Sequence, residues 1–455
     1  MAVQRNENKM NTVQTISAPL YEALKAHAEQ GRASFHTPGH KGNCAFLPLD
    51  RQYDLTELPD TDSLFEASGC IRESERKAAR LFGAAYTAVS SGGCTLAIQG
   101  MLAAFAGTGS KVIFCRNIHR SAVNTAALLG IAPVWVSHRC DGGEGLPGRV
   151  CAEDIRRAIE KNPDAAAVYL TSPDYYGCLS DIKGIAEICS FYEKPLLVDN
   201  AHGTHLISFG MHPITLGAAA SACSAHKTLP VLTGGAWLNC NDEAIGSKIK
   251  SSMALFGSTS PSYLPMASLD LARDWMEREG IAAFRELAGI VSGLREVAAS
   301  VGFGLPQGEC DPVRLTLLTR PMGMTGDEAA EYFRRKGVEC EHSDGGAVVF
   351  ILTPFNSETD IDRLRHTIGA FPKGRPITYE PIVPDELPMI IKSPREALLS
   401  RSENIPVPEA AGRIAAEAAC PCPPGVPVVM PGELIDKKCV NILLKTGITR
   451  INVIE

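Results

Sequence analysis

The chain has 455 residues, of which 45% are hydrophobic and 21% charged, so it can bury a large core and divide into about two or three domains. Its 44 basic and 51 acidic residues give a net charge of −7, which disfavours nucleic acid or an anionic membrane surface as the main partner. No apolar run is long enough to span a membrane and the N-terminus lacks a signal-like apolar core, so the expected location is the cytoplasm. The 15 scattered cysteines include no C-x-x-C pair, which favours reduced thiols over a zinc site.

Residues 1–80 are predicted to form an N-terminal arm with a helix over Pro19–Gln30 and a loop-rich, acidic stretch. The next part, 81–273, alternates short apolar runs with helical segments, which is typical of βα units and an α/β fold with a mostly parallel sheet. The predicted strands are Tyr86–Val89, Lys111–Cys115, Pro133–Ser137, Ala166–Ser172, Pro195–Ala201, Ala220–Ala225 and Gly234–Cys240.

The last part, 274–455, is predicted to be a smaller α+β domain with a Pro-rich tail. Its expected elements are helices over Asp274–Ala299 and Gly326–Lys336 and strands over Val313–Leu318 and Ala347–Leu352. The tail begins near Pro372, and the apolar content of Pro421–Ile435 favours an extended segment packed on the rest of the molecule over a disordered one.

A strand-to-helix turn after the first strand has the features of a phosphate site. It passes through Ser91, Gly92 and Gly93 into an apolar helix near Thr95, which leaves backbone N–H groups free at a helix N-terminus. Ser91, Cys94 and Thr95 can add side-chain contacts, and the glycines allow close approach. An ordinary turn is the alternative, because neither a P-loop nor a dinucleotide fingerprint is present.

Two further strand ends carry Asp199 and Lys227. A lysine amine and a nearby carboxylate are what pyridoxal phosphate needs, because the amine holds the aldehyde as an imine and the carboxylate keeps the ring nitrogen protonated. The loops after the carboxyl ends of parallel strands meet in one crevice, so His119, Ser172–Tyr176, Asp199–His202 and His226–Lys227 are expected to converge there.

Two histidine pairs have a spacing that permits metal binding, His36 with His40 and His202 with His205. Each pair lies in a loop containing glycine or proline, where no helix fixes the i,i+4 geometry, so no metal site is expected.

Several motifs together resemble the prokaryotic ornithine/lysine/arginine decarboxylases, which are pyridoxal phosphate enzymes of fold type I, the aspartate-aminotransferase fold. They span nearly the whole chain, and its length suits the shorter biosynthetic branch. The motifs are FHTPGHKG (Phe35–Gly42), DLTELPDTDSL (Asp54–Leu64), TSPDYYG (Thr171–Gly177), VDNAHGTH (Val198–His205), SAHKTLPVLTGG (Ser224–Gly235), STSPSY (Ser258–Tyr263) and AGRIAAEAACPCPPGVPVVMPGE (Ala411–Glu433).

The resemblance implies roles for individual residues. Lys227 is the Schiff-base lysine, Asp199 the partner of the ring nitrogen, and His226 a group between phosphate and substrate carboxylate. The other implied cofactor-binding residues are His119, which stacks on the ring, Ala201 beneath it, and Ser91, Gly92, Cys94, Thr95 and Ser224 around the phosphate. Ser258 and Thr259 are implied to reach the phosphate of a neighbouring subunit, which makes the protein a homodimer or higher homo-oligomer with shared sites.

The chain departs from the family pattern at two places. Gly93 and Cys94 stand where hydroxyl-bearing residues are common, and Asn200 follows Asp199 where an acidic residue is common. These departures put some phosphate contacts and any role of the Asn200 side chain in doubt.

The implied reaction is decarboxylation of a basic amino acid in polyamine biosynthesis, with arginine first and lysine or ornithine as alternatives. An acidic cluster containing Glu57 and Asp62 is the candidate binding site for the distal cation of the substrate, and Asp62 is the first choice. The competing interpretation is that the cluster is a solvated surface loop. An aminotransferase is a second possibility, since Arg314 can grip a substrate carboxylate. A non-catalytic homologue is a third.

Overall fold

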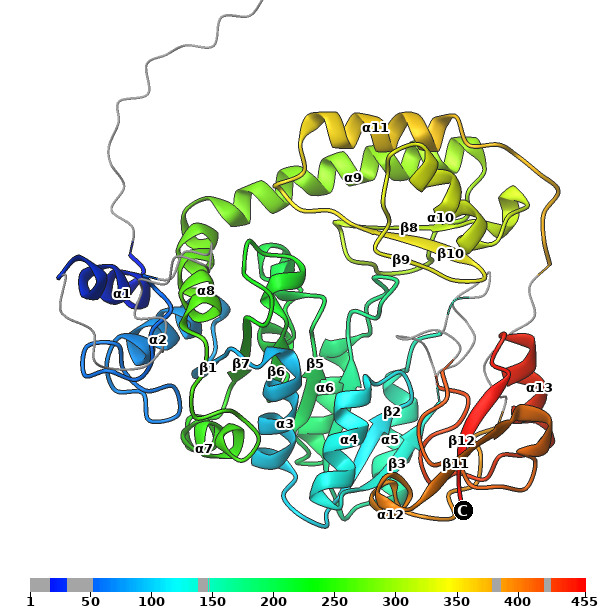
Figure 1. Ribbon diagram of the computed structural model, residues 1–455, viewed down its shortest axis with the longest axis horizontal. Coiled ribbons are helices and arrows are strands. Elements are labelled where there is room, and N and C mark those ends of the chain that lie inside the picture. The colour runs from blue at the N-terminus through cyan, green and yellow to red at the C-terminus, as the bar shows by residue number, and fades with distance from the viewer. Residues whose placement is uncertain (1–16, 31–51, 138–145, 147, 379–385, 421–426) are drawn as a thin grey trace, which may run out of the picture.

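The computed structural model describes residues 17–30, 52–137, 146, 148–378, 386–420 and 427–455. Figure 1 shows a large α/β body, a small sheet with helices at its upper right, and a C-terminal unit at its lower right. The predicted α/β fold with a mostly parallel sheet is confirmed. The motif Phe35–Gly42, with His36 and His40, lies outside the described residues. Within those residues, every helix is too short or too polar to cross a bilayer.

The large sheet has the strand order β1-β7-β6-β5-β4-β2-β3. Strand β7 is antiparallel to both of its neighbours, and all other neighbours are parallel. Its strands are β1 (Tyr86–Ser90), β2 (Lys111–Cys115), β3 (Ala132–Val136), β4 (Ala165–Thr171), β5 (Leu196–Asp199), β6 (Ala220–Cys223) and β7 (Ala236–Cys240). All seven predicted strands are therefore present, with ends that differ by at most two residues.

Helices cover both faces of this sheet, which explains why its strands are mostly apolar. In β2, Val112 and Phe114 pack on one face with apolar residues of α3, α4 and α7. The alternate residues Ile113 and Cys115 pack on the other face with α5 and α6. The bounds are α3 (Gly93–Phe105), α4 (Arg120–Leu129), α5 (Ala152–Lys161), α6 (Ile182–Phe191) and α7 (Glu243–Ala254).

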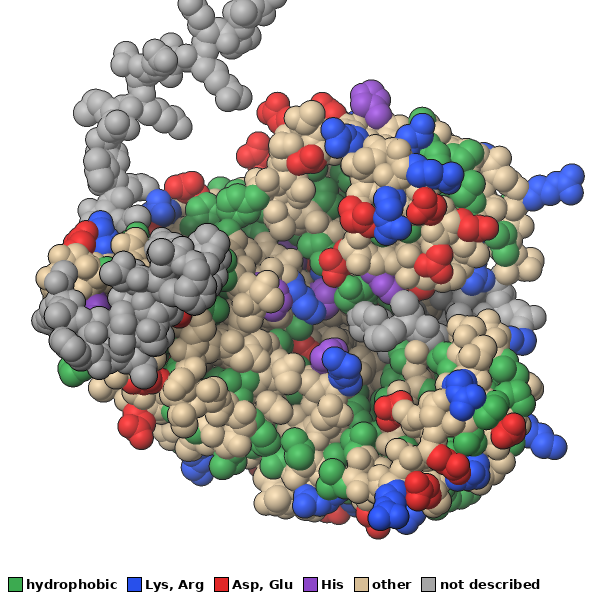
Figure 2. Space-filling model, in the orientation of Figure 1, with side chains coloured by type: hydrophobic (Ala, Val, Ile, Leu, Met, Phe, Trp, Pro, Cys, Tyr) green, Lys and Arg blue, Asp and Glu red, His purple; other side chains and the backbone are tan. Residues whose placement is uncertain are grey.

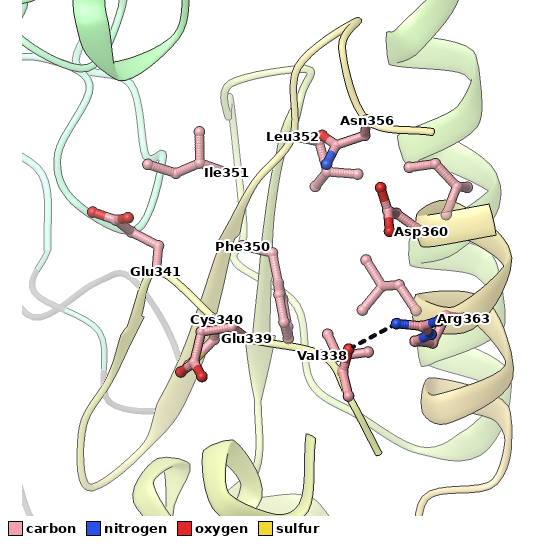
Figure 3. A pocket seen from close by; sticks show the side chains of 13 residues that line it. Val338, Glu339, Cys340, Glu341, Phe350, Ile351, Leu352, Asn356, Asp360 and Arg363 are labelled. Carbon is pink, nitrogen blue, oxygen red and sulfur yellow. Dashed lines mark hydrogen bonds between the residues drawn. The ribbon is translucent and has the colours of Figure 1, made fainter. Parts of the chain in front are cut away.

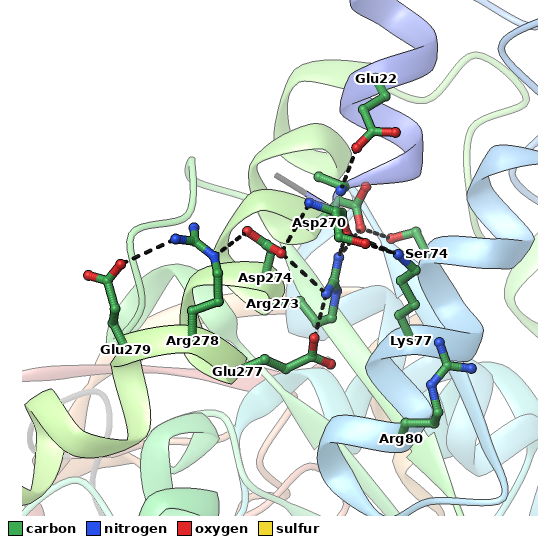
Figure 4. A network of polar contacts seen from close by, with 12 residues as sticks. Glu22, Ser74, Lys77, Arg80, Asp270, Arg273, Asp274, Glu277, Arg278 and Glu279 are labelled. Atoms are coloured by element: carbon green, nitrogen blue, oxygen red, sulfur yellow. Dashed lines mark hydrogen bonds and ion pairs between the residues drawn. The ribbon is translucent and has the colours of Figure 1, made fainter. Parts of the chain in front are cut away.

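The N-terminal arm is held against the body by a buried polar network (Figure 4). Helices α1 (Pro19–Glu29) and α2 (Cys70–Phe82) pack on α8 (Tyr263–Trp275). The Asp270 carboxylate of α8 accepts hydrogen bonds from the Leu20 N–H at 2.9 Å and from the Ser74 hydroxyl at 2.8 Å. Arg273, one turn further on, donates to the Ser17 carbonyl. One helix of the body thus fixes both helices of the arm.

A π-helical turn, Met276–Gly280, joins α8 to the long helix α9 (Ile281–Val301), so the helix predicted over Asp274–Ala299 is interrupted. Helix α9 leads to a small antiparallel sheet of order β8-β10-β9. The predicted elements β8 (Arg314–Leu318), α10 (Gly326–Arg335) and β10 (Ala347–Ile351) are confirmed, whereas β9 (His342–Ser343) and α11 (Glu358–Gly369) were not predicted. In Figure 1, α9 and α11 run side by side over this sheet.

The C-terminal unit has a sheet and an apolar cluster of its own, so residues 274–455 contain two separate sheets. Its elements are α12 (Pro394–Leu399), β11 (Ser402–Pro406), α13 (Lys437–Lys445) and β12 (Arg450–Ile454). These elements were not predicted, because β11 and β12 pair over a long stretch of intervening chain. The described part of Pro421–Ile435 begins at residue 427 and buries Val428, Val429 and Met430 completely.

Candidate active site

The parallel strands of the large sheet deliver the predicted site residues to one edge. Strands β1, β2, β5 and β6 run in the same direction, and the phosphate-type turn, His119, Asp199 and Lys227 follow their carboxyl ends. Figure 2 shows a hollow between the large body and the small sheet, with histidine and cationic side chains on its walls. The site therefore lies at the edge of the sheet that the sequence predicted.

Lys227 ends a single 3₁₀ turn, Ala225–Lys227, that directly follows β6. Its Nζ lies 2.8 Å from Nε2 of the buried His202. Burial lowers the pKa of Lys227, and Arg314 lowers it further, while the charges of Asp199, Cys94 and Glu341 act in the opposite direction. A lowered pKa favours the neutral amine, which is the form that attacks an aldehyde.

His202 connects Lys227 to Arg314. Arg314 Nη2 lies 3.3 Å from His202 Nδ1, and a guanidinium can only donate, so Nδ1 is the acceptor. Burial lowers the pKa of His202 well below its ordinary value, so the ring is neutral and carries its proton on Nε2. Nε2 then donates to Lys227, which can accept only as an unprotonated amine. The network therefore agrees with the lowered pKa of Lys227.

Asp199 closes β5 and is 1% exposed. One carboxylate oxygen accepts a hydrogen bond from the Ala201 N–H at 3.1 Å. Burial raises the pKa of Asp199, while His119 and Lys227 act to lower it. A buried carboxylate is costly unless a cation meets it, so this position suits a protonated ring nitrogen.

His119 is the N-cap of α4, and its Nδ1 accepts a hydrogen bond from the Ser121 N–H at 3.2 Å. His119 is exposed, so it is accessible to a ligand. His226 is half-buried, with Nδ1 3.3 Å from the Gly235 carbonyl oxygen and 3.4 Å from Ser224 Oγ. Burial lowers the pKa of His226. Ser224 thus contacts His226 in this structure.

The phosphate-type turn runs into α3 with Gly92 at the N-cap. The Gly93 N–H donates to the Gly234 carbonyl at 2.8 Å, which ties this turn to the loop before β7. Within the described residues, the N–H groups of Cys94 and Thr95 have no acceptor, and no side chain caps α3. The Cys94 thiol is buried in the core below, and burial raises its pKa well above the ordinary value. The turn offers backbone donors to an anion, while the Cys94 thiol points into the core.

Ser258 and Thr259 lie in an exposed loop after α7. The Ser258 hydroxyl bonds within its own loop, accepting from the Ser260 N–H at 3.1 Å. Neither side chain has a hydrogen bond with the phosphate-type turn or Lys227 among the described residues. Both are therefore accessible to a second chain.

The acidic cluster of the arm has other partners. Asp62 has a positive φ of 67° and caps the start of α2, where its two oxygens accept hydrogen bonds from the N–H groups of Ser63, Ser68, Gly69, Ile71 and Arg72. Burial acts to raise the pKa of Asp62, but these N–H groups outweigh it and lower the pKa. Glu57 is half-buried, and its Oε1 is buried without a hydrogen-bond partner among the described residues. The structure thus gives Asp62 a capping role in α2.

Sequence reasoning missed a carboxylate on the small sheet. Glu341 Oε1 accepts a hydrogen bond from the Tyr175 hydroxyl at 2.8 Å. The Tyr175 ring packs edge-on against His202 with centroids 4.9 Å apart, and its carbonyl accepts from Arg314 at 3.0 Å. Tyr175 lay in a loop expected at the crevice, but no sequence signal pointed to Glu341.

The second histidine pair does not converge on one point. His202 faces Lys227 and Arg314, whereas His205 Nε2 lies 2.8 Å from the Asp311 carboxylate and its ring stacks on Phe284. Among the described residues no group of three metal-ligating side chains is found.

A pocket in the small-sheet part lies between β10 and α11 (Figure 3). Of its charged side chains, Glu339 pairs with Arg334, Asp360 caps α11 through Ser357, Arg363 donates to the Gly337 carbonyl, and Glu341 accepts from the Tyr175 hydroxyl. Neither Lys227 nor Asp199 lines it. The pocket therefore shares Glu341 with the cleft but contains neither of the two strand-end residues.

Comparison with known proteins agrees with the fold described above. Residues 18–298 match the Orn/Lys/Arg decarboxylase major domain, and residues 385–446 match the C-terminal domain of that family. The chain is 30% identical to an arginine decarboxylase of Bacillus subtilis, over 94% of this chain and 93% of the relative. It is 22% identical to the constitutive lysine decarboxylase of Escherichia coli, over 97% of this chain and 79% of that protein.

Solved structures show the same fold. The Escherichia coli constitutive lysine decarboxylase superposes with a TM-score of 0.79 at 19% identity, covering 97% of this chain and 82% of the other. Lysine decarboxylase A from Pseudomonas aeruginosa gives a TM-score of 0.81 at 18% identity, covering 96% and 80%. With both family domains matched in their expected order, the chain belongs to the Orn/Lys/Arg decarboxylase family of amino-acid decarboxylases.

Proposed function

We propose that this protein is an arginine decarboxylase that uses pyridoxal phosphate, releases CO₂ and agmatine, and serves polyamine biosynthesis in the cytoplasm. The observation that carries the proposal is a half-buried Lys227 amine of lowered pKa, close to the buried Asp199 at adjacent strand ends. The similarity to Bacillus arginine decarboxylases favours arginine over lysine and ornithine.

The residues present fit this cofactor. The unpaired N–H groups of Cys94 and Thr95 would bind the phosphate, and a Cβ on Gly93 would meet nothing within 4 Å, so the turn is open to a ligand. His119 and Ala201 would lie on either face of the ring, Asp199 would pair with its nitrogen, and Lys227 would hold it covalently. When bound, pyridoxal phosphate supplies a ring that accepts the electron pair left when CO₂ departs.

Side chains of the protein itself would control which groups hold and transfer protons. Asp199 would keep the ring nitrogen in the charged form, because a buried carboxylate stabilises a neighbouring cation. The Arg314–His202 pair favours the unprotonated form of the Lys227 amine. After CO₂ leaves, a proton must return to the substrate Cα, and Lys227 Nζ and His226 Nε2 are the groups proposed to deliver it.

We propose that the Glu341 carboxylate binds the distal guanidinium of the substrate. The charge of Glu341 acts on Lys227, and the hydroxyl of Tyr175, whose ring packs against His202, fixes one of the Glu341 oxygens. The other oxygen has no hydrogen bond to a described residue, and a long cationic substrate needs such a partner. Asp62 is a weaker candidate because its oxygens already cap α2. Glu57, with a buried oxygen lacking a partner, remains a second candidate.

Arg314 lies in the same site as Lys227 and His202. Its buried guanidinium contacts His202 and the Tyr175 carbonyl, so it is positioned beside Lys227 to bind an α-carboxylate or to tune His202. An aminotransferase would use such an arginine as a carboxylate clamp. The family assignment favours decarboxylation, and the products distinguish the two reactions.

We further propose that the working protein is a homodimer or higher homo-oligomer with shared sites. The support is the exposed position of Ser258 and Thr259 and the resemblance of their STSPSY motif to a loop that serves a neighbouring subunit.

The test is to incubate the purified protein with pyridoxal phosphate and arginine, lysine or ornithine, and to measure CO₂ with agmatine, cadaverine or putrescine. Arginine should give equal amounts of CO₂ and agmatine and the highest kcat/KM. Faster turnover of lysine or ornithine would contradict the substrate assignment. In a parallel incubation with 2-oxoglutarate as amino acceptor, release of a keto acid without CO₂ would instead indicate an aminotransferase.

A further inference from the structure

Two cysteines face each other where the large body meets the small sheet. Cys178 follows the Tyr175–Gly177 loop, and Cys310 lies in the segment that leads into β8. They form an isolated antiparallel pair. The flanking hydrogen bonds run from the Asp311 N–H to the Gly177 carbonyl at 2.8 Å and from the Leu179 N–H to the Glu309 carbonyl at 3.0 Å.

This pattern identifies the type of cross-strand pair. Because the hydrogen bonds connect the residues on either side, Cys178 and Cys310 form a non-hydrogen-bonded pair, in which opposite Cα atoms are typically about 4.5 Å apart. A disulfide spans Cα separations of about 4.4–6.8 Å. The two side chains also lie on the same face, since directly opposite residues of a ladder do. A disulfide can therefore form here with little movement of the backbone.

The surroundings of Cys310 activate its thiol. Arg149 Nη2 lies 3.7 Å from Cys310 Sγ and is held by the Glu309 carbonyl at 2.7 Å. A hydrogen bond from the Cys178 thiol, followed by the charges of Arg149 and Arg295, lowers the pKa of Cys310 although burial opposes the shift. Cys310 is half-exposed while Cys178 is buried, so peroxide reaches Cys310 first. A low-pKa, accessible cysteine beside a second thiol is the arrangement of a redox-sensing pair.

We propose that Cys310 and Cys178 are a redox-active pair, in which a hydroperoxide oxidises Cys310 and Cys178 resolves it to a reversible disulfide. The Cys310 thiolate attacks one peroxide oxygen, the O–O bond breaks, and hydroxide leaves from a hydrogen peroxide molecule. The Cys178 sulfur then attacks the sulfenic sulfur, its proton and the sulfenic hydroxyl leave as water, and the S–S bond forms. Two electrons pass from the two sulfurs to the peroxide, and a dithiol reverses the change.

The disulfide would cross-link two segments that reach the active site. The loop before Cys178 carries Tyr175, and the strand that follows Cys310 begins with Arg314, and both of these residues contact His202. The inference does not depend on the proposed substrate, because the bond can be detected without any assay of turnover.

The experiment uses the full-length, fully reduced protein and one molar equivalent of hydrogen peroxide, followed by acid quenching, alkylation and non-reducing peptide mapping. We expect a linked Cys178–Cys310 peptide, the loss of two thiols per chain, and recovery of both thiols with dithiothreitol. Alkylated Cys178 and Cys310 alongside oxidation of other cysteines would overturn the proposal, and so would oxidation of Cys310 to sulfinic acid without a linked peptide.

Variants identify the order of events. Cys178→Ser should stop at a Cys310 sulfenic acid that dimedone traps, with the loss of one thiol, whereas Cys310→Ser should lose none at this dose. Cys340→Ser is the matched control, because Cys340 is also half-buried, and it should behave like the wild type. Two thiols lost from either variant of the pair would contradict the assignment. The wild-type peptide map decides the question should a variant fold poorly.

Discussion

Arg116 and Glu433 form a buried ion pair that connects the end of β2 to the C-terminal unit. Arg116 Nη2 lies 2.7 Å from Glu433 Oε2, Nη1 contacts the other oxygen, and the two side chains are 1% and 0% exposed. The Met430 N–H also donates to Glu433 at 2.7 Å, and Arg116 donates to the Val428 carbonyl at 3.2 Å. His119 lies three residues beyond Arg116, so this pair anchors both the unit and the approach to the site.

Glu433→Gln should therefore destabilise the protein strongly. Removing one charge leaves the Arg116 guanidinium buried without its counter-ion, which costs about 3–5 kcal/mol. Urea denaturation followed by far-UV circular dichroism measures the change. Glu403→Gln is the control, because its pair with Arg413 is solvent-exposed and should contribute little. Equal decreases in the free energy of unfolding for the two variants would show that the buried pair stabilises the protein no more than the exposed pair.

Lys227→Ala should abolish covalent cofactor binding. The protein reconstituted with pyridoxal phosphate should be yellow, and the variant should lose its visible absorption on dialysis, since no amine remains to hold the aldehyde. Lys248→Ala removes an exposed lysine of α7 and should keep the wild-type spectrum. After borohydride reduction, the labelled peptide should contain Lys227, and a label on any other lysine would refute the assignment.

Glu341→Gln should raise the KM for arginine about tenfold or more, equivalent to about 1.4 kcal/mol, because the guanidinium loses its charged partner. The visible spectrum of the cofactor should not change. Asp62→Asn is the comparison: it should leave KM within about twofold but reduce stability by about 0.5–2 kcal/mol through loss of the α2 cap. A raised KM in Asp62→Asn alone would place recognition on the arm.

Buried histidines should make the protein less stable in acid. Burial lowers the pKa of His212 to about 3, compared with about 6.5 in an unfolded chain, and lowers the pKa of His202 in the same direction. Between these two pH values the unfolded chain binds protons that the folded protein excludes, so stability falls as pH falls below about 6.5. Each such histidine contributes up to about 1.4 kcal/mol per pH unit.

Urea denaturation of the cofactor-free protein between pH 5 and pH 8 tests this dependence. His212→Asn should reduce the slope of stability against pH, whereas His366→Gln, at an exposed position on α11, should retain it. An unchanged slope in His212→Asn would mean that the pKa of His212 is the same in the folded and the unfolded protein.

Subunits should complement one another if the sites are shared. Inactive Lys227→Ala chains mixed with inactive chains carrying Ser258→Ala and Thr259→Ala should recover about a quarter of the activity, because a hybrid dimer has one intact site of two. The extent of subunit exchange is measured in parallel by native mass spectrometry. Complete exchange without recovered activity would place both groups in the site of one chain.

The sequence predicted the part of the site that follows from local order along the chain. Asp199 and Lys227 each follow an apolar run, and parallel strands bring such ends to one edge, so their proximity needed no knowledge of the rest of the fold. The turn at Gly92 and Gly93 was predictable for the same reason.

The remaining contacts depend on long-range packing. Glu341 reaches Tyr175 only because the small sheet folds back over the body, and no periodicity in the sequence encodes that docking. Asp62 resembled a substrate ligand in an acidic stretch, but a positive φ turns its carboxylate toward the first N–H groups of α2. The sequence places His202 in the crevice, but its contacts with Lys227 and Arg314 were not predicted, because these two partners come from other parts of the chain.

The reversed direction of β7 constrains how this protein can vary. Because β7 begins at the edge where its neighbours end, the loop before it meets two functional segments at once: the Gly234 carbonyl holds Gly93, and the Gly235 carbonyl holds the His226 ring. Insertion or deletion of a residue between Lys227 and Ala236 would displace the phosphate turn and the lysine turn together. Variation in length is therefore better tolerated elsewhere, and a library that diversifies this enzyme should keep that loop at its native length.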